Sequence, residues 1–385
     1  MSSRRRRRIV GTDQVSAPLR VMWLIKGLGP GGAEQQLLEL ARVADSDRFA
    51  PQVVFALDWK DRLAPPIRDA GVPTDCLGVR TLADLRWVLR LRRHLRDDEI
   101  DIVHSHSPLL AVVARLLAPT VRSRPLLVST EHNVWLARRP LTRMMNALTY
   151  RLDDAHIAVS ARVRDSLPSR LRSSTEVIDH GVDVARIGCL RHRRTDTRAS
   201  LGIADDTLVV CTIANFRWQK GYTELLTAVR LLRDQGRQFI VLVIGQGPLE
   251  QEVRELRDRL GLTDDVQLLG HRWDAVEILA ACDVLAIASR HEGYPIVALE
   301  ALAAGIPIVS TDVGAVPTIV TDGIEGRVVP VDDGTAFAAA LGELIDDHDT
   351  RSQMSIAALR RGADYDIRRS LESLTQMYER LMATR

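Results

Sequence analysis

Two glutamates, Glu292 and Glu300, stand eight positions apart and can together bind a ligand that carries several hydroxyl groups. An ionised carboxylate accepts hydrogen bonds from paired hydroxyls. Residues 283–289, just before Glu292, form an apolar run typical of a buried parallel strand. Gly293 allows a close approach of the backbone to a ligand, and Pro295 suits the first turn of a helix. The stretch therefore predicts a strand, a tight loop and a helix.

The start of this predicted helix is a candidate phosphate site. Free N–H groups and the positive end of the helix dipole meet there. At a rise of ~1.5 Å per residue the two carboxylates lie up to roughly 12 Å apart, which fits a sugar, a diphosphate and a ribose in a row. The alternative is a solvated pair of glutamates on an ordinary helix. The candidate residues are Glu292, Gly293, Tyr294, Pro295, Ile296 and Glu300.

A second candidate phosphate site follows the apolar segment 207–214. Arg217 and Lys220 stand directly after this predicted strand, and Gly221 precedes a predicted helix. Arginine binds a phosphate as a fork and lysine binds it as a point charge. The two side chains therefore predict a clamp for a diphosphate.

Two turns that contain glycine also follow predicted strands. Gly31 and Gly32 come after the strand at 19–25, and Gly245 and Gly247 come after an apolar run that begins at Phe239. A glycine turn between a strand and a helix is a place for a phosphate or for close approach of a substrate. The glycine spacing of the first turn does not match the dinucleotide-binding fingerprint.

Histidines end two further predicted strands. His104 and His106 are two residues apart; we expect them on opposite faces of the strand, and we interpret His104 as structural. His132 lies just after the strand at 126–130, and strand ends carry the ligand sites of α/β proteins. The alternative for His132 is a structural histidine. No Asp-x-Asp pair ends a strand, so no metal site is predicted.

These residues must be positioned by strands that alternate with helices, a pattern that predicts parallel sheets with crossover helices. The 385 residues favour two domains. We expect a basic tail at 1–17, a first domain at 18–190, a second domain at 191–365 and a final helix at 366–385. The polar segment 186–198 is the expected linker.

The stretch from Glu292 to Glu300 resembles the E-x7-E motif of the retaining glycosyltransferases of family 4, and so do Ala304–Val309 and Asp312–Pro317. The segment 177–183 is also similar to that family, with His180 in place of the usual Asn. Asn215 stands where much of the family has an arginine. The resemblance implies the α/β GT-B fold, in which two Rossmann-like domains face each other across a cleft and the last helix crosses back to the first domain.

The resemblance also implies an activity, which is transfer of a sugar from a nucleotide diphosphate sugar to an acceptor hydroxyl with retention at the anomeric carbon. It implies that no metal or other cofactor is needed and that Glu292 is not a covalent nucleophile. The implied contacts are His132 and Glu292 with the sugar, Arg217 and Lys220 with the diphosphate, Glu300 with the ribose, Gly31 and Gly32 with the donor phosphate and acceptor, and Gly245 and Gly247 near the base.

The net charge of +2 conceals an asymmetry between the two halves. Residues 1–195 hold 33 Lys and Arg against 21 Asp and Glu, whereas the remainder holds 19 against 29. Two predicted helices, at 81–96 and 138–151, mix arginines with apolar residues, as do helices that lie on anionic membranes. The alternative is an outer helix with solvated arginines. We expect peripheral membrane contact and an acceptor that can be lipid-linked.

Several other classes are disfavoured. No apolar run approaches the ~20 residues of a membrane span, and the N-terminus lacks the apolar core of a secretory signal. Four scattered cysteines fit a reducing cytoplasm. The arginines at 4–8 leave nucleic acid as a candidate partner, but the acidic second half argues against it. A sugar-nucleotide epimerase of the same fold is the other alternative, and the residues select no oligomeric state.

Overall fold

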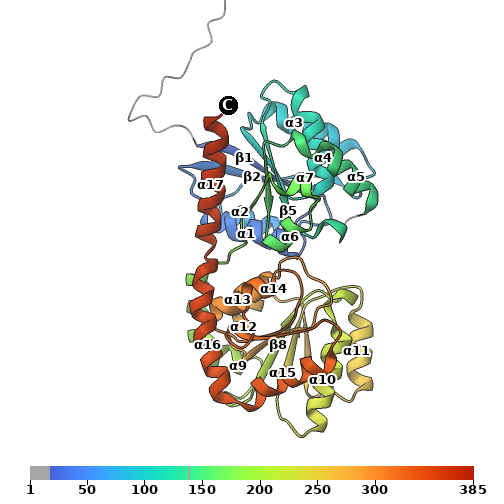
Figure 1. The fold of residues 1–385 in the computed structure, drawn as a ribbon, viewed down its shortest axis with the longest axis vertical. Coiled ribbons are helices and arrows are strands. Elements are labelled where there is room, and N and C mark those ends of the chain that lie inside the picture. Colours follow the sequence, from blue (N-terminus) through green and yellow to red (C-terminus); the bar gives the residue numbers. More distant parts are fainter. Residues whose placement is uncertain (1–17, 138) are drawn as a thin grey trace, which may run out of the picture.

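The computed structural model describes residues 18–137 and 139–385, which form two α/β domains (Figure 1). The predicted basic tail at 1–17 lies outside the described residues. The first domain contains a parallel sheet in the order β3-β2-β1-β4-β5-β6-β7. Its strands are β1 (Leu19–Ile25), β2 (Phe49–Leu57), β3 (Thr74–Val79), β4 (Ile102–Ser105), β5 (Leu126–Glu131), β6 (Ala155–Ala158) and β7 (Thr175–Val177).

The second domain contains a parallel sheet in the order β10-β9-β8-β11-β12-β13. In both sheets the order reverses beside the first strand, between β1 and β4 and between β8 and β11. Ligands of open α/β sheets bind at such switch points, beyond the carboxyl ends of the strands. The second sheet consists of β8 (Val209–Ile213), β9 (Ile240–Ile244), β10 (Val266–Gly270), β11 (Val284–Ile287), β12 (Ile308–Thr311) and β13 (Gly326–Val329).

Helices cover both faces of each sheet, which explains why the central strands are apolar along their whole length. Val21 and Leu24, which lie on opposite faces of β1, are both fully buried. The helices of the first domain are α1 (Gly32–Val43), α2 (Ala64–Asp69), α3 (Arg86–Asp97), α4 (Pro108–Leu117), α5 (Pro140–Thr149), α6 (Ala161–Asp165) and α7 (Ser169–Arg172). Those of the second are α9 (Arg194–Ser200), α10 (Tyr222–Asp234), α11 (Glu250–Arg259), α12 (Ala275–Ala280), α13 (Ile296–Ala304), α14 (Val316–Ile319), α15 (Gly334–Asp346) and α16 (His348–Gly362).

The segment expected to link the domains is helical. Asp183 caps α8 (Val184–Leu190), because its side chain accepts a hydrogen bond from the Arg186 N–H. Arg194 and Arg198 then anchor α9 to the second domain through Asp283, with N–O distances of 2.6 and 2.8 Å. Arg194 and Arg198 therefore fix the chain to the second domain.

The last helix, α17 (Ile367–Ala383), lies along the first domain (Figure 1). Its buried residues Leu374, Met377 and Tyr378 belong to the same core cluster as β1 and α1. The Trp23 indole N–H of β1 points at the Tyr378 hydroxyl at 3.4 Å. The predicted fold class is thereby confirmed in its two facing Rossmann-like domains and its returning helix.

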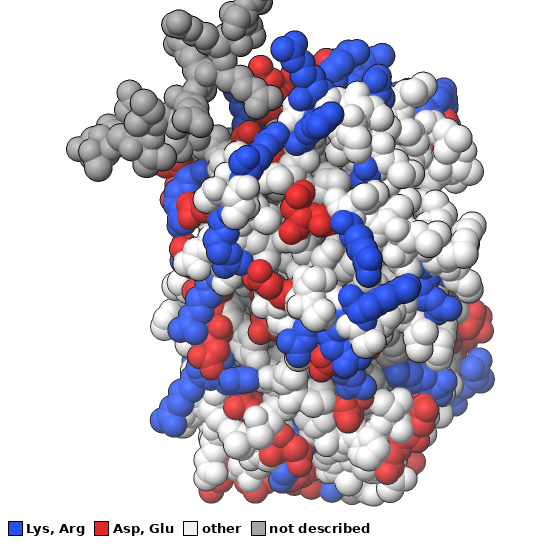
Figure 2. All heavy atoms as spheres, turned by 45° about the horizontal axis from the view of Figure 1, so that its top comes forward, with Lys and Arg blue, Asp and Glu red and all other residues white. Residues whose placement is uncertain are grey.

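The surface reflects the uneven charge of the sequence. Figure 2 shows blue basic side chains from the top of the molecule down to its middle, with red acidic side chains between them and along the bottom. Among the residues that the structure describes, no helix is both long and apolar enough to cross a lipid bilayer.

Candidate active site

A cleft of about 630 Å³ lies between the two domains at the switch points of both sheets. Most of the predicted site residues line it. They are Gly31, Gly32, Lys220, Gly245, Glu292, Tyr294, Pro295, Ile296 and Glu300. His132, Arg217, Gly247 and Gly293 are not in direct contact with this space. A second hollow, of about 720 Å³ between α8 and α16, contains none of the predicted residues.

Lys220 and Glu292 meet within the cleft. The Lys220 Nζ lies 2.6 and 2.8 Å from the two carboxylate oxygens of Glu292, and the Ser289 hydroxyl donates to the same carboxylate at 2.7 Å. Gly221, in the left-handed conformation at φ 66°, makes this possible, because a Cβ there would stand 1.8 Å from the Ala288 carbonyl oxygen. The loops after β8 and β11 are thus pressed together, and a cation and a carboxylate share one site.

The loop after Glu292 also touches the first domain. A Cβ on Gly293 would come within 2.5 Å of the His132 carbonyl oxygen, so a side chain at this position would push the domains apart. Pro295 precedes α13, whose first turn has no side-chain cap. The uncapped N–H groups can therefore bind an anion in the cleft next to Lys220.

Glu300 lies in the middle of α13 in a largely buried position, 8% exposed. Burial raises the pKa of its carboxyl to about 7, the carboxylate of Glu39 adds to the rise, and Arg186 and Arg42 oppose it. Glu39 of α1 is itself buried and bonds Arg42 at 2.6 Å and Arg186 at 3.1 Å. None of these three residues was predicted from the sequence, because Arg186 lies 147 positions from Glu39 along the chain.

His104 and His106, at the end of β4, lie on the same side of the chain. Their ring centroids are 4.3 Å apart, so the expectation that they face opposite ways was wrong. Only successive side chains of an extended strand point to opposite faces, and residues two apart share a face. His104 bonds the Tyr378 hydroxyl and the Thr130 hydroxyl, both at 2.6 Å, and so joins α17 to the sheet.

His132 lies between two other histidines. Its Nε2 is 3.1 Å from Nδ1 of His106, and its Nδ1 is 3.3 Å from Nε2 of His180. The ring of Tyr294, from the second domain, meets His180 edge-on with centroids 5.1 Å apart. Burial lowers the pKa of His132 to about 4 and holds those of His106 and His180 well below their usual range. All three rings are therefore uncharged at neutral pH.

The remaining predicted residues lie at the edge of the site. Arg217 is exposed and begins the short turn that ends at Lys220. Asn215 bonds the first domain, its amide donating to the Pro30 carbonyl at 3.1 Å beside the predicted glycine turn. Gly247 packs against the backbone of Phe216. The role of Arg217 as a phosphate ligand stays a prediction.

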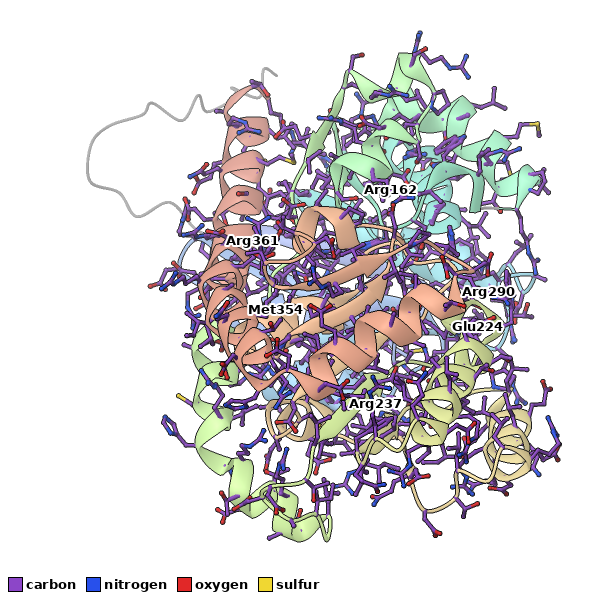
Figure 3. All side chains as sticks on the ribbon, turned by 60° about the horizontal axis from the view of Figure 1, so that its bottom comes forward. Arg162, Glu224, Arg237, Arg290, Met354 and Arg361 are labelled. Carbon is purple, nitrogen blue, oxygen red and sulfur yellow. The ribbon has the colours of Figure 1, made fainter. Side chains whose placement is uncertain are left out.

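A further contact joins the domains beside the cleft. Arg162 of α6 lies 3.0 Å from the Asp312 carboxylate and 3.2 Å from the Gly314 carbonyl of the second domain (Figure 3). Within residues 18–137 and 139–385, no group of three or more His, Cys, Asp or Glu side chains is placed to hold a metal ion.

Comparison with known families matches almost the whole chain. Residues 30–186 match the family described as Glycosyltransferase Family 4, and residues 193–361 match Glycosyl transferases group 1. The chain is 30% identical to the D-inositol 3-phosphate glycosyltransferase of Corynebacterium jeikeium, over 73% of this chain and 72% of the relative. It is 34% identical to the enzyme of the same name from Corynebacterium diphtheriae, over 53% of this chain and only about half, 50%, of that relative.

Solved structures share the fold at low sequence identity. Anabaena Alr3699/HepE in complex with UDP-glucose superposes with a TM-score of 0.80 at 20% identity, over 95% of this chain and 100% of that one. Sucrose-phosphate synthase from Thermosynechococcus elongatus gives 0.77 at 20% identity, over 95% and 100%. These similarities confirm the predicted GT-B arrangement of the two domains.

Proposed function

Since the chain belongs to the glycosyltransferases of family 4 and group 1, we propose that it transfers a sugar from a nucleotide diphosphate sugar to an acceptor hydroxyl with retention at the anomeric carbon. The observation that supports this most is the meeting of Lys220, Glu292 and the uncapped start of α13 in one cleft, with Glu300 at its far end. Glu292 can hold the sugar, Lys220 and the start of α13 the leaving diphosphate, and Glu300 the ribose, which is the order of these groups in the donor.

The proposed chemistry depends on offsetting the charge of the departing diphosphate. Lys220 and the N–H groups of α13 are fixed before the reaction begins, and preorganised groups of this kind stabilise developing charge without reorganisation. Arg217 would join them from the loop edge. Glu292 holds sugar hydroxyls rather than attacking the sugar. The acceptor hydroxyl approaches the sugar on the face from which the nucleotide diphosphate departs. The donor phosphate helps to remove the proton of this hydroxyl.

We propose uridine diphosphate as the leaving group, because the Anabaena structures that share this fold contain UDP or UDP-glucose. Thermal unfolding with UDP, GDP, ADP, TDP and CMP tests this, since a ligand that binds the folded state raises the melting temperature. We expect a shift with UDP that does not depend on Mg²⁺ and that Lys220→Ala and Glu300→Ala abolish. Arg230→Ala, on the outer face of α10, is the matched control and keeps the shift.

A donor shift alone does not establish transfer. Incubation of UDP-sugar with and without acceptors separates transfer from epimerisation, because an epimerase converts the donor when no acceptor is present. Failure of all nucleotides to stabilise the protein would contradict the proposed donor site.

The acceptor we propose is a lipid-linked intermediate of a cell-surface polysaccharide or glycolipid, used at the cytoplasmic face of the membrane. Helix α5 supports membrane contact. Leu141, Met144 and Leu148, at helical spacing, are 64, 54 and 76% exposed, and Arg139 and Arg143 flank them. An apolar stripe bordered by arginines complements an anionic lipid surface, where the stripe enters the interface and the cations meet the headgroups.

Helix α3 supplies a matched control for this surface. It buries its apolar face, with Trp87, Leu91 and Leu95 in the core, and leaves Leu89 exposed among solvated arginines. We expect cosedimentation with phosphatidylglycerol vesicles at low salt, reduced by about tenfold or more in Leu148→Glu and unchanged in Leu89→Glu. Equal binding to phosphatidylcholine vesicles, or transfer only to soluble acceptors such as an inositol phosphate, would contradict the proposal.

A further inference from the structure

Three histidines of the first domain, beside the cleft, form a continuous hydrogen-bonded chain. His132 is at its centre, with ring centroids 5.3 Å from both His106 and His180. Each ring nitrogen of His132 faces a nitrogen of a neighbouring ring, at 3.1 and 3.3 Å. The outer nitrogen of His106, Nε2, is buried and has no hydrogen-bond partner among the described residues.

The chain can hold its protons in only one favourable order. Three neutral rings carry one ring proton each, and each of the two bonds needs one donor and one acceptor. A proton on the buried His106 Nε2 would be a donor without an acceptor, and such buried N–H groups are rare and costly. The proton of His106 is therefore on Nδ1 and is donated to His132, whose own proton is on Nδ1 and is donated to His180.

We infer that His180 is a positioning residue that holds His132 in the Nδ1–H tautomer, so that the three histidines act as one unit in substrate recognition. The inference rests on the proposed function, because it assigns this unit a place in sugar transfer. The Nε2 lone pair of His132 is already occupied by His106. A substrate hydroxyl can therefore bond the ring only by accepting the Nδ1–H in place of His180.

Tyr294 connects this unit to the donor side of the cleft. It belongs to the loop between Glu292 and α13, lines the cleft, and packs its ring edge-on against His180. The position of His180 therefore depends on contact between the two domains, and the orientation of His132 follows from it.

The tautomer can be measured without any activity. In the full chain labelled with ¹⁵N-histidine, long-range proton–nitrogen correlation at neutral pH distinguishes protonated from unprotonated ring nitrogens, and single His→Gln substitutions assign the ten histidines. We expect His106, His132 and His180 to carry their protons on Nδ1. A proton on Nε2 of His132 overturns the inference, whatever reaction the enzyme catalyses.

Two substitutions then test the positioning role. His180→Phe keeps a ring against Tyr294 but removes the bond, whereas His180→Gln places an amide near the former Nε2. We expect His180→Phe to lower kcat about tenfold and to leave donor KM within about twofold of wild type. His180→Gln should recover most of the lost kcat. Only in His180→Phe should His132 populate both tautomers.

Controls separate this inference from failure of the proposed function. The exposed His192→Phe should behave as wild type, and an unchanged UDP-induced shift in melting temperature shows that His180→Phe is folded. Equal activity and an equal His132 tautomer in the Phe variant and wild type would overturn the positioning role. Absence of transfer by wild type would instead contradict the proposed function and leave the tautomer measurement decisive for the histidine chain.

Discussion

The two walls of the cleft use opposite electrostatics. The second-domain wall is charged, with Lys220 bonded to Glu292, whereas the first domain places neutral histidine rings around His132 beside the cleft. A leaving diphosphate gains charge during transfer and needs a fixed cation and oriented N–H groups. Sugar hydroxyls stay neutral and need directed donors and acceptors. Under the proposed function, nucleotide binding belongs to the charged wall of the second domain and hydroxyl recognition to the histidines of the first.

The largest expected effect comes from removing the cation of the charged wall. Lys220→Ala should lower kcat/KM by about 10²–10³-fold, because one preorganised group at the developing charge is lost. Steady-state transfer from UDP-sugar measures this. His132→Ala should also reduce transfer but leave the stabilisation by UDP intact, since His132 lies on the other wall. If UDP no longer raised the melting temperature of His132→Ala, the separate roles proposed for the two sides of the cleft would be contradicted.

Glu300 gives the charged wall a pH dependence. Burial holds the pKa of this carboxyl at about 7, and only the ionised form accepts bonds from both ribose hydroxyls. Uridine affinity should therefore rise up to about tenfold from about pH 6 to about pH 8. Calorimetry with uridine excludes titration of a phosphate. In Glu300→Gln the affinity should be weaker and flat with pH, and a wild-type profile that is equally flat would contradict the assignment.

Acid should change the contributions of the histidines and of Glu300 to the free energy of unfolding in opposite directions. His106, His132 and His180 have a pKa below that of the unfolded chain, so the unfolded state gains protons first and stability is lost as the pH falls below about 6.5. The pKa of Glu300 is raised, so its protonation in the folded state opposes this loss between about pH 7 and about pH 4.5.

Removing one histidine measures this effect. Relative to wild type, His180→Gln should lose about 1.4 kcal/mol less unfolding free energy for each pH unit below about 6.5. Urea unfolding at several pH values provides the comparison, with the exposed His192→Gln as control. Parallel curves for wild type and His180→Gln would show that His180 is not kept neutral by the fold.

The smallest effect is expected where the walls meet at the surface. Arg162 and Asp312 are about half exposed, and exposed ion pairs contribute only about 0–1 kcal/mol. Asp312→Asn should therefore change stability by less than about 1 kcal/mol and leave donor KM within about twofold. Thermal unfolding and kinetics check both. A large effect would mean that this contact, rather than the loop at Gly293, sets the distance between the walls.

The sequence predicted the charged wall better than the neutral one. Glu292, Lys220 and the glycines that shape their loops follow apolar strands directly, so local order along the chain reveals them. Glu39 and Arg186 meet beside Glu300 although 147 positions separate them, and no local pattern indicates such a contact. The closeness of His104 and His106 was missed because the prediction placed them on opposite faces, whereas residues two apart on a strand share a face.

Helices α3 and α5 show a second limit of local patterns. Both mix arginines with apolar residues, and their local patterns do not distinguish them. In the structure α5 turns a polar face inward, because the buried Arg115 bonds Asn146 at 2.6 Å and Thr149 at 3.0 Å. Its leucines are consequently left outside. Only the tertiary position of Arg115 decides which face of α5 is buried.

The return of α17 has a consequence for synthesis of the chain. Met377 and Tyr378 complete the core around Trp23, although more than 350 residues separate Tyr378 from β1. While the ribosome is still making the second domain, part of the apolar core of the first domain stays exposed, because α17 has not yet been synthesised. Domains usually fold in the order in which they emerge. Here the domain made first is finished last, and a chain that stops short of α17 exposes that core to chaperones and proteases.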